Sequence, residues 1–289
     1  MSRFLTDWLD RIDIGSVPDP TVDTLGRVIR QHLRAVPFEN LMVLGGKIPA
    51  LDHKALTHKI VDGRRGGYCF ELNGLMGHGL ERIGFSVRPS LARVLWQRSE
   101  PGPRTHLFLA VEAEGDTWLA DAGFGGPCPD VPIPIGSGAS GSSPEPFSLT
   151  EEPGLGTVLS RRMADGRPAA LYCFQKEHVS AGDIEAANWL AATYPKSTFR
   201  NRVMAALGDS RSRKTLDGQR FGRVENGIAV EERLLGSATE VADCLAGTFG
   251  LSLDAAERAA IAQVAGADAA GRGSRQGARG THDGLEIGG

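Results

Sequence analysis

The chain has 289 residues, 41% hydrophobic and 23% charged, which is enough apolar material for a sizeable core. A formal net charge of −3 leaves no basic excess, so nucleic acid and anionic membranes are poor partners for it. Acids interrupt the first ten residues, and no run approaches the ~20 apolar residues of a membrane-spanning helix. We therefore expect a cytoplasmic protein of two or three domains, or one large one.

The first 84 residues have helical periodicity. Residues 21–34 carry one apolar stripe behind a possible Thr21 cap, and residues 52–61 form a second segment. A third helix is predicted over 69–83, because Gly84 follows it at the position where helices usually end. This region is expected to be a helical bundle.

The pattern changes to strands after Gly84. Runs rich in Val, Leu, Phe and Trp are separated by turn residues, and a Gly/Ser-rich segment over 136–146 is expected to be a flexible insert. The predicted strands are 85–96, 105–113, 117–124, 158–162 and 169–177.

The last part of the chain mixes both classes. A helix is predicted over 182–194, and Asn226-Gly227 indicates a hairpin between strands 215–224 and 227–235. Helices are predicted over 237–249 and 254–264, followed by a flexible Gly-rich tail over 266–289.

Cys69 is the first candidate for chemistry. It follows Gly66-Gly67 and opens a helix, where unpaired amide N–H groups stabilise a thiolate, the reactive form of cysteine, or a developing oxyanion. The glycines would also let a substrate approach closely. A buried structural role fits this local pattern equally well. The other cysteines, Cys128, Cys173 and Cys244, are interpreted as buried apolar residues, since no Cys pair predicts a metal site or a disulfide.

A nucleophilic thiolate needs an imidazole, and His106 is the best candidate. It begins the apolar strand 106–111, whereas His32, His53, His58 and His78 have polar neighbours on predicted helices and are expected at the surface. Taken singly, His106 could equally be a hydrogen-bonded core histidine.

Asp121 would complete the set. It ends an apolar strand, where a carboxylate is costly unless it is paired. In a hairpin that turns at 114–116, the numbers of two facing residues add up to about 227–229. Asp121 would therefore lie opposite His106, within a residue or two. Asp121 would then orient the imidazole ring, as in a catalytic triad.

These residues resemble the motifs of the arylamine N-acetyltransferase family. The nucleophile motif is similar to Arg65-Gly-Gly-Tyr-Cys-Phe-Glu-Leu-Asn73, the histidine motif to Arg104-Thr-His106, and the aspartate motif to Asp121-Ala-Gly-Phe-Gly125. Pro37-Phe-Glu-Asn40 resembles another family element, and the run from Asn188 to Phe199 resembles a later helix and the strand after it. The resemblance covers about residues 1–262.

The resemblance implies an α+β fold with a cysteine-protease-like Cys-His-Asp core in three parts. These are a helical bundle with the nucleophile (1–84), a β-barrel with His and Asp (85–181) and an α/β lid (182–265). It also implies transfer of an acetyl group from acetyl-CoA to arylamines, arylhydrazines or arylhydroxylamines through acetyl-Cys69, without a metal. A monomer or homodimer is expected.

The resemblance further suggests pocket residues. Trp96, Phe124, Gly125 and Gly126 are candidates for contacts with coenzyme A, and Phe38, Phe70 and Phe199 for contacts with the acceptor. For the aromatic residues, core packing is an equally simple interpretation.

Three other functions remain open from the sequence. Macrolactam-forming amide synthases share the triad, some hydrolases use Cys-His-Asp, and a binding protein could have lost catalysis.

Overall fold

The computed structural model describes residues 3–98, 100–135, 146–163 and 165–265. The insert predicted at 136–146, except its last residue, and the tail predicted at 266–289 lie outside the described residues. In the part described, no helix is long and apolar enough to cross a membrane. The helices are α1 (Arg3–Arg11), α2 (Val22–Ala35), α3 (Leu41–Leu44), α4 (His53–Leu56), the π-helix η1 (Thr57–Asp62), α5 (Cys69–Ile83), α6 (Ala181–Thr193), α7 (Thr198–Asn201) and α8 (Ala238–Phe249), with a further helix over 255–265.

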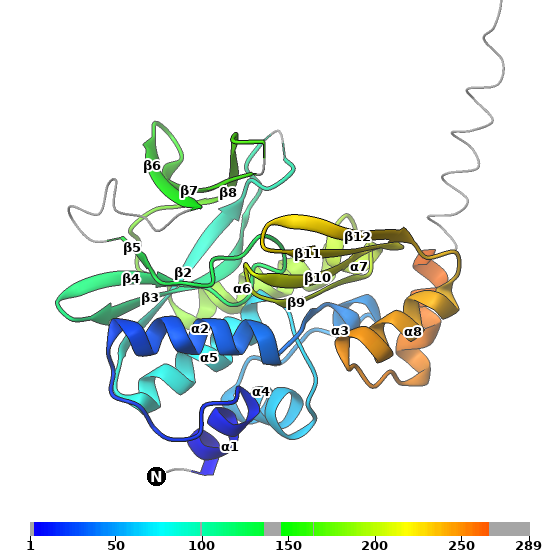
Figure 1. Cartoon of the computed structure of the whole chain (residues 1–289), viewed down its shortest axis with the longest axis horizontal. Coiled ribbons are helices and arrows are strands. Elements are labelled where there is room, and N and C mark those ends of the chain that lie inside the picture. The colour runs from blue at the N-terminus through cyan, green and yellow to red at the C-terminus, as the bar shows by residue number, and fades with distance from the viewer. Residues whose placement is uncertain (1–2, 99, 136–145, 164, 266–289) are drawn as a thin grey trace, which may run out of the picture.

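The strands form two antiparallel sheets (Figure 1). The larger has the order β5-β4-β3-β2-β8-β7-β6, with β5 and β6 as its edges. The predicted barrel is therefore a near-barrel with two open edges. Its strands are β2 (Ser86–Val94), β3 (Arg104–Ala113), β4 (Asp116–Ala120), β5 (Ile133–Pro134), β6 (Phe147–Glu152), β7 (Gly156–Arg162) and β8 (Pro168–Phe174).

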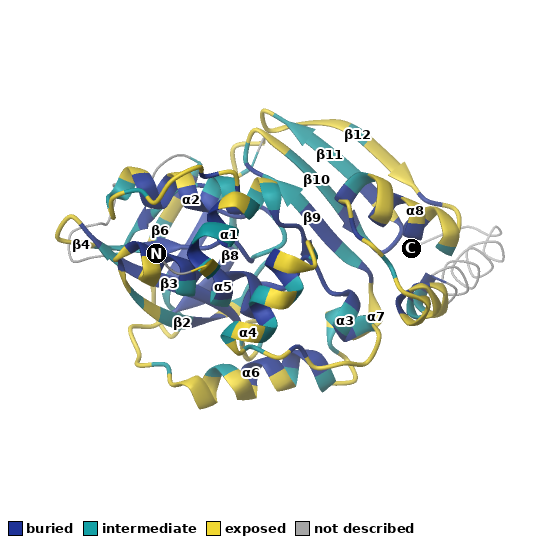
Figure 2. Ribbon diagram, turned by 90° about the horizontal axis from the view of Figure 1, so that it is seen from below, coloured by how far each residue is buried: buried dark blue, intermediate teal, exposed yellow. Residues whose placement is uncertain are grey.

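The smaller sheet has the order β1-β9-β10-β11-β12 and packs on α8. Burial decreases across it from β9 to the edge strand β12 (Figure 2). Its first strand comes from the N-terminal region, so the smaller sheet joins the two ends of the described chain. Its strands are β1 (Phe38–Glu39), β9 (Met204–Gly208), β10 (Ser212–Asp217), β11 (Arg220–Glu225) and β12 (Ile228–Leu234).

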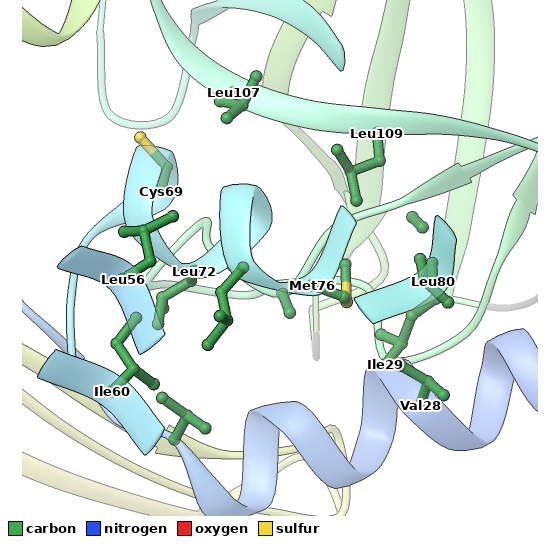
Figure 3. Packing of buried hydrophobic residues seen from close by; sticks show 14 of the residues in the cluster. Val28, Ile29, Leu56, Ile60, Cys69, Leu72, Met76, Leu80, Leu107 and Leu109 are labelled. Atoms are coloured by element: carbon green, nitrogen blue, oxygen red, sulfur yellow. The ribbon is translucent and has the colours of Figure 1, made fainter. Parts of the chain in front are cut away.

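The N-terminal helices agree with the sequence pattern. The Thr21 side chain accepts a hydrogen bond from the Thr24 amide and caps α2. Helix α5 has the predicted bounds, and Gly84 ends it with a φ of +118°, a left-handed conformation that glycine adopts without strain. The apolar faces of α2 and α5 meet in the main core (Figure 3).

Two strand predictions were wrong. The run predicted at 215–224 is a hairpin, because Gly218 turns the chain with a φ of +61° between β10 and β11. Asp217-Gly218 is itself a hairpin signal of the same kind as Asn226-Gly227, but the predicted strand continued through it. The strand expected near Phe199 is instead the short helix α7, and β9 begins only at Met204.

The prediction for His32 was also wrong. Its side chain has no exposed surface and packs between α1 and α2 near the Trp8 ring. Burial, followed by the charge of Arg11, lowers the pKa of His32 to about 3. It is therefore a neutral core residue, which its polar sequence neighbours did not reveal.

A pair of glycine substitutions tests the packing of α5. A Cβ at Gly79 would lie 2.3 Å from the Trp8 ring, whereas a Cβ at Gly247 in α8 meets nothing within 4 Å. We expect Gly79→Ala to reduce the free energy of unfolding by about 1–3 kcal/mol through overpacking. Gly247→Ala should increase it by about 0.5–1 kcal/mol. Urea unfolding of both variants measures this, and equal effects would contradict the close contact.

Candidate active site

Cys69 is the first residue of α5. Tyr68 is extended just before the helix, and its amide donates to the Glu71 carboxylate at 3.2 Å, so Glu71 caps the first turn. Figure 3 shows the Cys69 sulfur directed away from the packed Leu72 and Met76. It lies 3.6 Å from the Thr105 carbonyl oxygen of β3 and is almost fully buried. The amides of the first helical turn favour negative charge here.

The two glycines before Cys69 are required by the chain itself. A Cβ at Gly66 would lie 2.0 Å from the Pro37 carbonyl oxygen, and one at Gly67 would lie 2.8 Å from the Glu71 side chain. These contacts explain both glycines by chain packing, and the expectation that they also let a substrate approach stays a prediction. A third glycine, Gly123, brings its loop against the nucleophile, since a Cβ there would lie 2.8 Å from the Cys69 Cα.

The β3–β4 hairpin brings the imidazole and the carboxylate together. The residue numbers of its facing pairs, such as Leu109↔Ala120, add up to 229, which is within the predicted range. The ladder stops at this pair and β4 ends at Ala120, so Asp121 lies just beyond the strand rather than within it. There its Oδ2 lies 2.8 Å from Nε2 of His106.

Asp121 is fully buried and has a complete set of partners. Its Oδ1 accepts hydrogen bonds from the Asn73 Nδ2 at 2.9 Å and the Gly123 amide at 2.8 Å. Its Oδ2 accepts from the Tyr172 hydroxyl at 3.1 Å as well as from His106. These bonds compensate for the desolvation of the carboxylate and fix its orientation.

The electrostatics of the site favour an ion pair. Burial alone would lower the pKa of His106, but the Asp121 carboxylate and, next, the Cys69 side chain raise it to about 10. Burial alone would raise the pKa of Asp121, but His106, Asn73 and the Gly123 amide lower it. The imidazole is thus held protonated between a carboxylate and a sulfur.

The residues predicted to contact coenzyme A lie in two places. The Phe124 ring packs edge-on against His106 at 5.2 Å between ring centroids, and Trp96 packs partly buried on the core of the larger sheet. Gly125 and Gly126 line a narrow cavity with Phe38, between the Asp121 loop and the smaller sheet.

The residues predicted to contact the acceptor also differ in position. Phe38 is buried and lies 6.3 Å from the partly buried Phe199 ring. Phe70 has no exposed surface and belongs to the main core. Their roles in binding stay predictions.

Sequence reasoning gave no role to Asn73 and missed Tyr172. Asn73 follows Cys69 by four residues, so both project from the same face of α5, and that spacing could have revealed it. Its amide also donates to the Leu107 carbonyl oxygen at 2.6 Å and accepts from the Ala122 amide at 2.9 Å. Tyr172 comes from β8, and nothing in the sequence linked that strand to Asp121.

Comparison with known proteins agrees with this geometry. The model of the family described as N-acetyltransferase matches residues 21–258. An arylamine N-acetyltransferase of Mycobacterium tuberculosis is 37% identical over 90% of this chain and 94% of its own length. The chain belongs to the arylamine N-acetyltransferase family. It is therefore an acyltransferase, as the resemblance of its motifs indicated.

Further relatives extend the comparison to structure and to a second activity. The arylamine N-acetyltransferase of Mycobacterium marinum, solved in complex with CoA, has a TM-score of 0.81 and 35% identity over 90% of this chain and 99% of that one. The Mycobacterium smegmatis structure has a TM-score of 0.84 and 33% identity over 92% and 99%. A Salmonella typhimurium relative, 34% identical over 88% of this chain and 91% of its own, is also named an N-hydroxyarylamine O-acetyltransferase.

The part of the chain described contains no group of three or more His, Cys, Asp or Glu side chains that could hold a metal ion.

The ion pair predicts how stability depends on pH. His106 has a pKa raised from about 6.5 to about 10, so its contribution is complete below pH 6.5 and is lost as the pH rises towards 10. Asp121 has a lowered pKa, so its contribution is lost as the pH falls below about 4. We expect the free energy of unfolding to fall between pH 6.5 and 10, by at most about 1.4 kcal/mol per pH unit. The His106→Gln variant should lack this fall in denaturant titrations, and an equal fall in both proteins would contradict the assignment.

Tyr172→Phe tests the support of Asp121. It removes one donor to a buried carboxylate and keeps the ring, so we expect a loss of about 1.5–3 kcal/mol in the free energy of unfolding. The control Tyr194→Phe alters a tyrosine that is 48% exposed, and it should stay within about 0.5 kcal/mol of wild type. Thermal unfolding compares the two, and indistinguishable midpoints would remove Tyr172 from the site.

Proposed function

We propose that the enzyme transfers an acetyl group from acetyl-CoA to the nitrogen of arylamines, arylhydrazines or arylhydroxylamines through an acetyl-Cys69 intermediate. The observation that carries the proposal is the arrangement of Cys69 at the start of α5, facing a His106 ring that Asp121 holds at 2.8 Å. Such a thiolate–imidazolium pair is a nucleophile with its acid in place.

In the first step, the Cys69 thiolate attacks the thioester carbonyl carbon of acetyl-CoA. The carbonyl oxygen becomes an oxyanion next to the Cys69 amide, in the first turn of α5, where an N–H group has no intrahelical acceptor. The intermediate collapses with cleavage of the bond between carbon and CoA sulfur. His106 gives its proton to the departing thiolate, so that free CoA leaves and His106 is neutral.

In the second step, the amine attacks the acetyl-Cys69 carbonyl carbon. Neutral His106 accepts the proton that the nitrogen loses, and the bond between carbon and Cys69 sulfur breaks. The N-acetyl product leaves, and the thiolate–imidazolium pair is restored. Aromatic amines suit this step because their low basicity leaves them neutral at pH 7. The buried position of Cys69 and His106 limits hydrolysis of the thioester.

The choice of substrates has separate support. The Mycobacterium marinum relative was solved with CoA, and the Salmonella relative is named for both N- and O-acetyl transfer. In this chain, Gly125 and Gly126 follow Asp121 and line a cavity with Ala122 and Phe38, and we propose that the pantetheine arm passes close to the backbone of these glycines. We propose that the C-terminal unit, 182–265, is the lid of this cavity. The barrel and bundle boundaries, cytoplasmic location and monomer or homodimer state stay predictions.

The experiment is an intact-mass measurement after brief exposure to acetyl-CoA. We expect wild type to gain the mass of one acetyl group and Cys69→Ala to gain none. Addition of an arylamine such as 4-anisidine should then discharge the adduct and form its N-acetyl product, which chromatography detects.

The other outcomes separate the alternatives. An adduct that discharges rapidly without amine would favour a hydrolase. Absence of an adduct from acetyl-CoA, with one formed from a carrier-protein thioester, would favour a macrolactam-forming amide synthase. A Cys69 that does not react even with iodoacetamide would indicate a binding protein.

A further inference from the structure

A buried cluster of charged side chains lies behind the nucleophile. The Lys59 Nζ lies 2.7 Å from Oε1 of Glu71 and 3.7 Å from Oε1 of Glu39. The Arg65 guanidinium lies 3.2 Å from the same Glu39 oxygen and 2.7 Å from Oε1 of Glu257, in the helix over 255–265. The five side chains come from five segments: β1, η1, the loop before α5, α5 itself and the helix over 255–265. The mechanism proposed above uses none of them.

Glu71 connects this cluster to the nucleophile. It is two residues after Cys69 in the first turn of α5, and its Oε2 accepts the Tyr68 amide. Its side chain is only 3% exposed, so its charge is poorly screened by water. Burial raises the pKa of this carboxyl, and Lys59 is the main group that lowers it. An anion at this helix end stabilises the helix, but it opposes the formation of a second anion, the Cys69 thiolate, at the same end.

Lys59 cancels that opposition. It is 12% exposed and is the only cation within 4 Å of Glu71 among the described residues. The cluster has three carboxylates and two cations, a formal charge of −1, and loss of Lys59 would change this to −2. Burial alone would lower the pKa of Lys59, but Glu39 and Glu71 raise it above its ordinary value. Lys59 therefore stays charged at neutral pH.

We propose that Lys59 is a positioning residue of the reaction, which neutralises the Glu71 cap and so allows the start of α5 to stabilise the Cys69 thiolate. This inference rests on the proposed function, because it assumes that Cys69 reacts as a thiolate. It assigns to η1 a part in setting the reactivity of the nucleophile.

The test measures the rate of Cys69 alkylation by iodoacetamide from about pH 4 to 9, the range in which activated thiols titrate. Peptide mass spectrometry identifies the alkylated cysteine. The variant Lys59→Met keeps a long side chain and removes its charge. In this variant we expect the midpoint of the pH dependence of the alkylation rate to rise by about one pH unit. Alkylation below the midpoint should then be about tenfold slower. Lys59→Arg should restore the wild-type profile.

The double variant Lys59→Met with Glu71→Gln separates electrostatics from structure. It removes both charges and keeps both shapes, so its midpoint should return close to that of wild type. Should Lys59→Met alone not fold, Glu71→Gln alone still tests the proposal, because an unopposed Lys59 should lower the midpoint.

A midpoint unchanged in Lys59→Met, not restored in the double variant, or not lowered in Glu71→Gln would each overturn the proposal. Alkylation does not depend on acetyl-CoA. Failure of acetyl transfer with the expected alkylation profiles would therefore refute the proposed substrates and leave the role of Lys59 intact.

Discussion

The active-site structure depends on the burial of one charged carboxylate. Asp121 lies in a fully desolvated position, where an ionised side chain is stable only if every lone pair is satisfied. Its partners come from α5, β3, β8 and its own loop. Because each partner contributes only if its element is in place, the carboxylate links correct folding of these elements to the geometry of His106 and Cys69.

Opposite charges also surround Cys69 at the start of α5. The start of α5 attracts anions, and the structure places two there, the Glu71 cap and the prospective thiolate. Lys59 on one side and the protonated His106 on the other provide the opposite charges. Cys69 therefore lies between two ion pairs, Lys59–Glu71 on its own helix side and His106–Asp121 at the near-barrel.

Local chemistry explains which elements could be predicted. Helix α5 was predicted with its bounds because its apolar period, the glycines before it and Gly84 after it agree. The β3–β4 register followed from a short turn and alternating strands. The β10–β11 hairpin was missed although the polar Asp217-Gly218 pair marks its turn, because the residues on both sides of it were taken as one strand. His32 was misplaced because its burial depends on α1, which its neighbours in sequence do not specify.

The sequence by itself selected Cys69, His106 and Asp121 as the candidate site residues, since each is part of a short motif at the end of a regular element. It also determined the family to which these motifs belong. The tertiary structure alone decided that Tyr172 supports Asp121, and that Glu39, Arg65 and Glu257 meet behind Cys69. Such contacts join residues separated by 26 to 192 positions. No local period or turn encodes them, because they form only when separate layers pack and the buried charges find their partners.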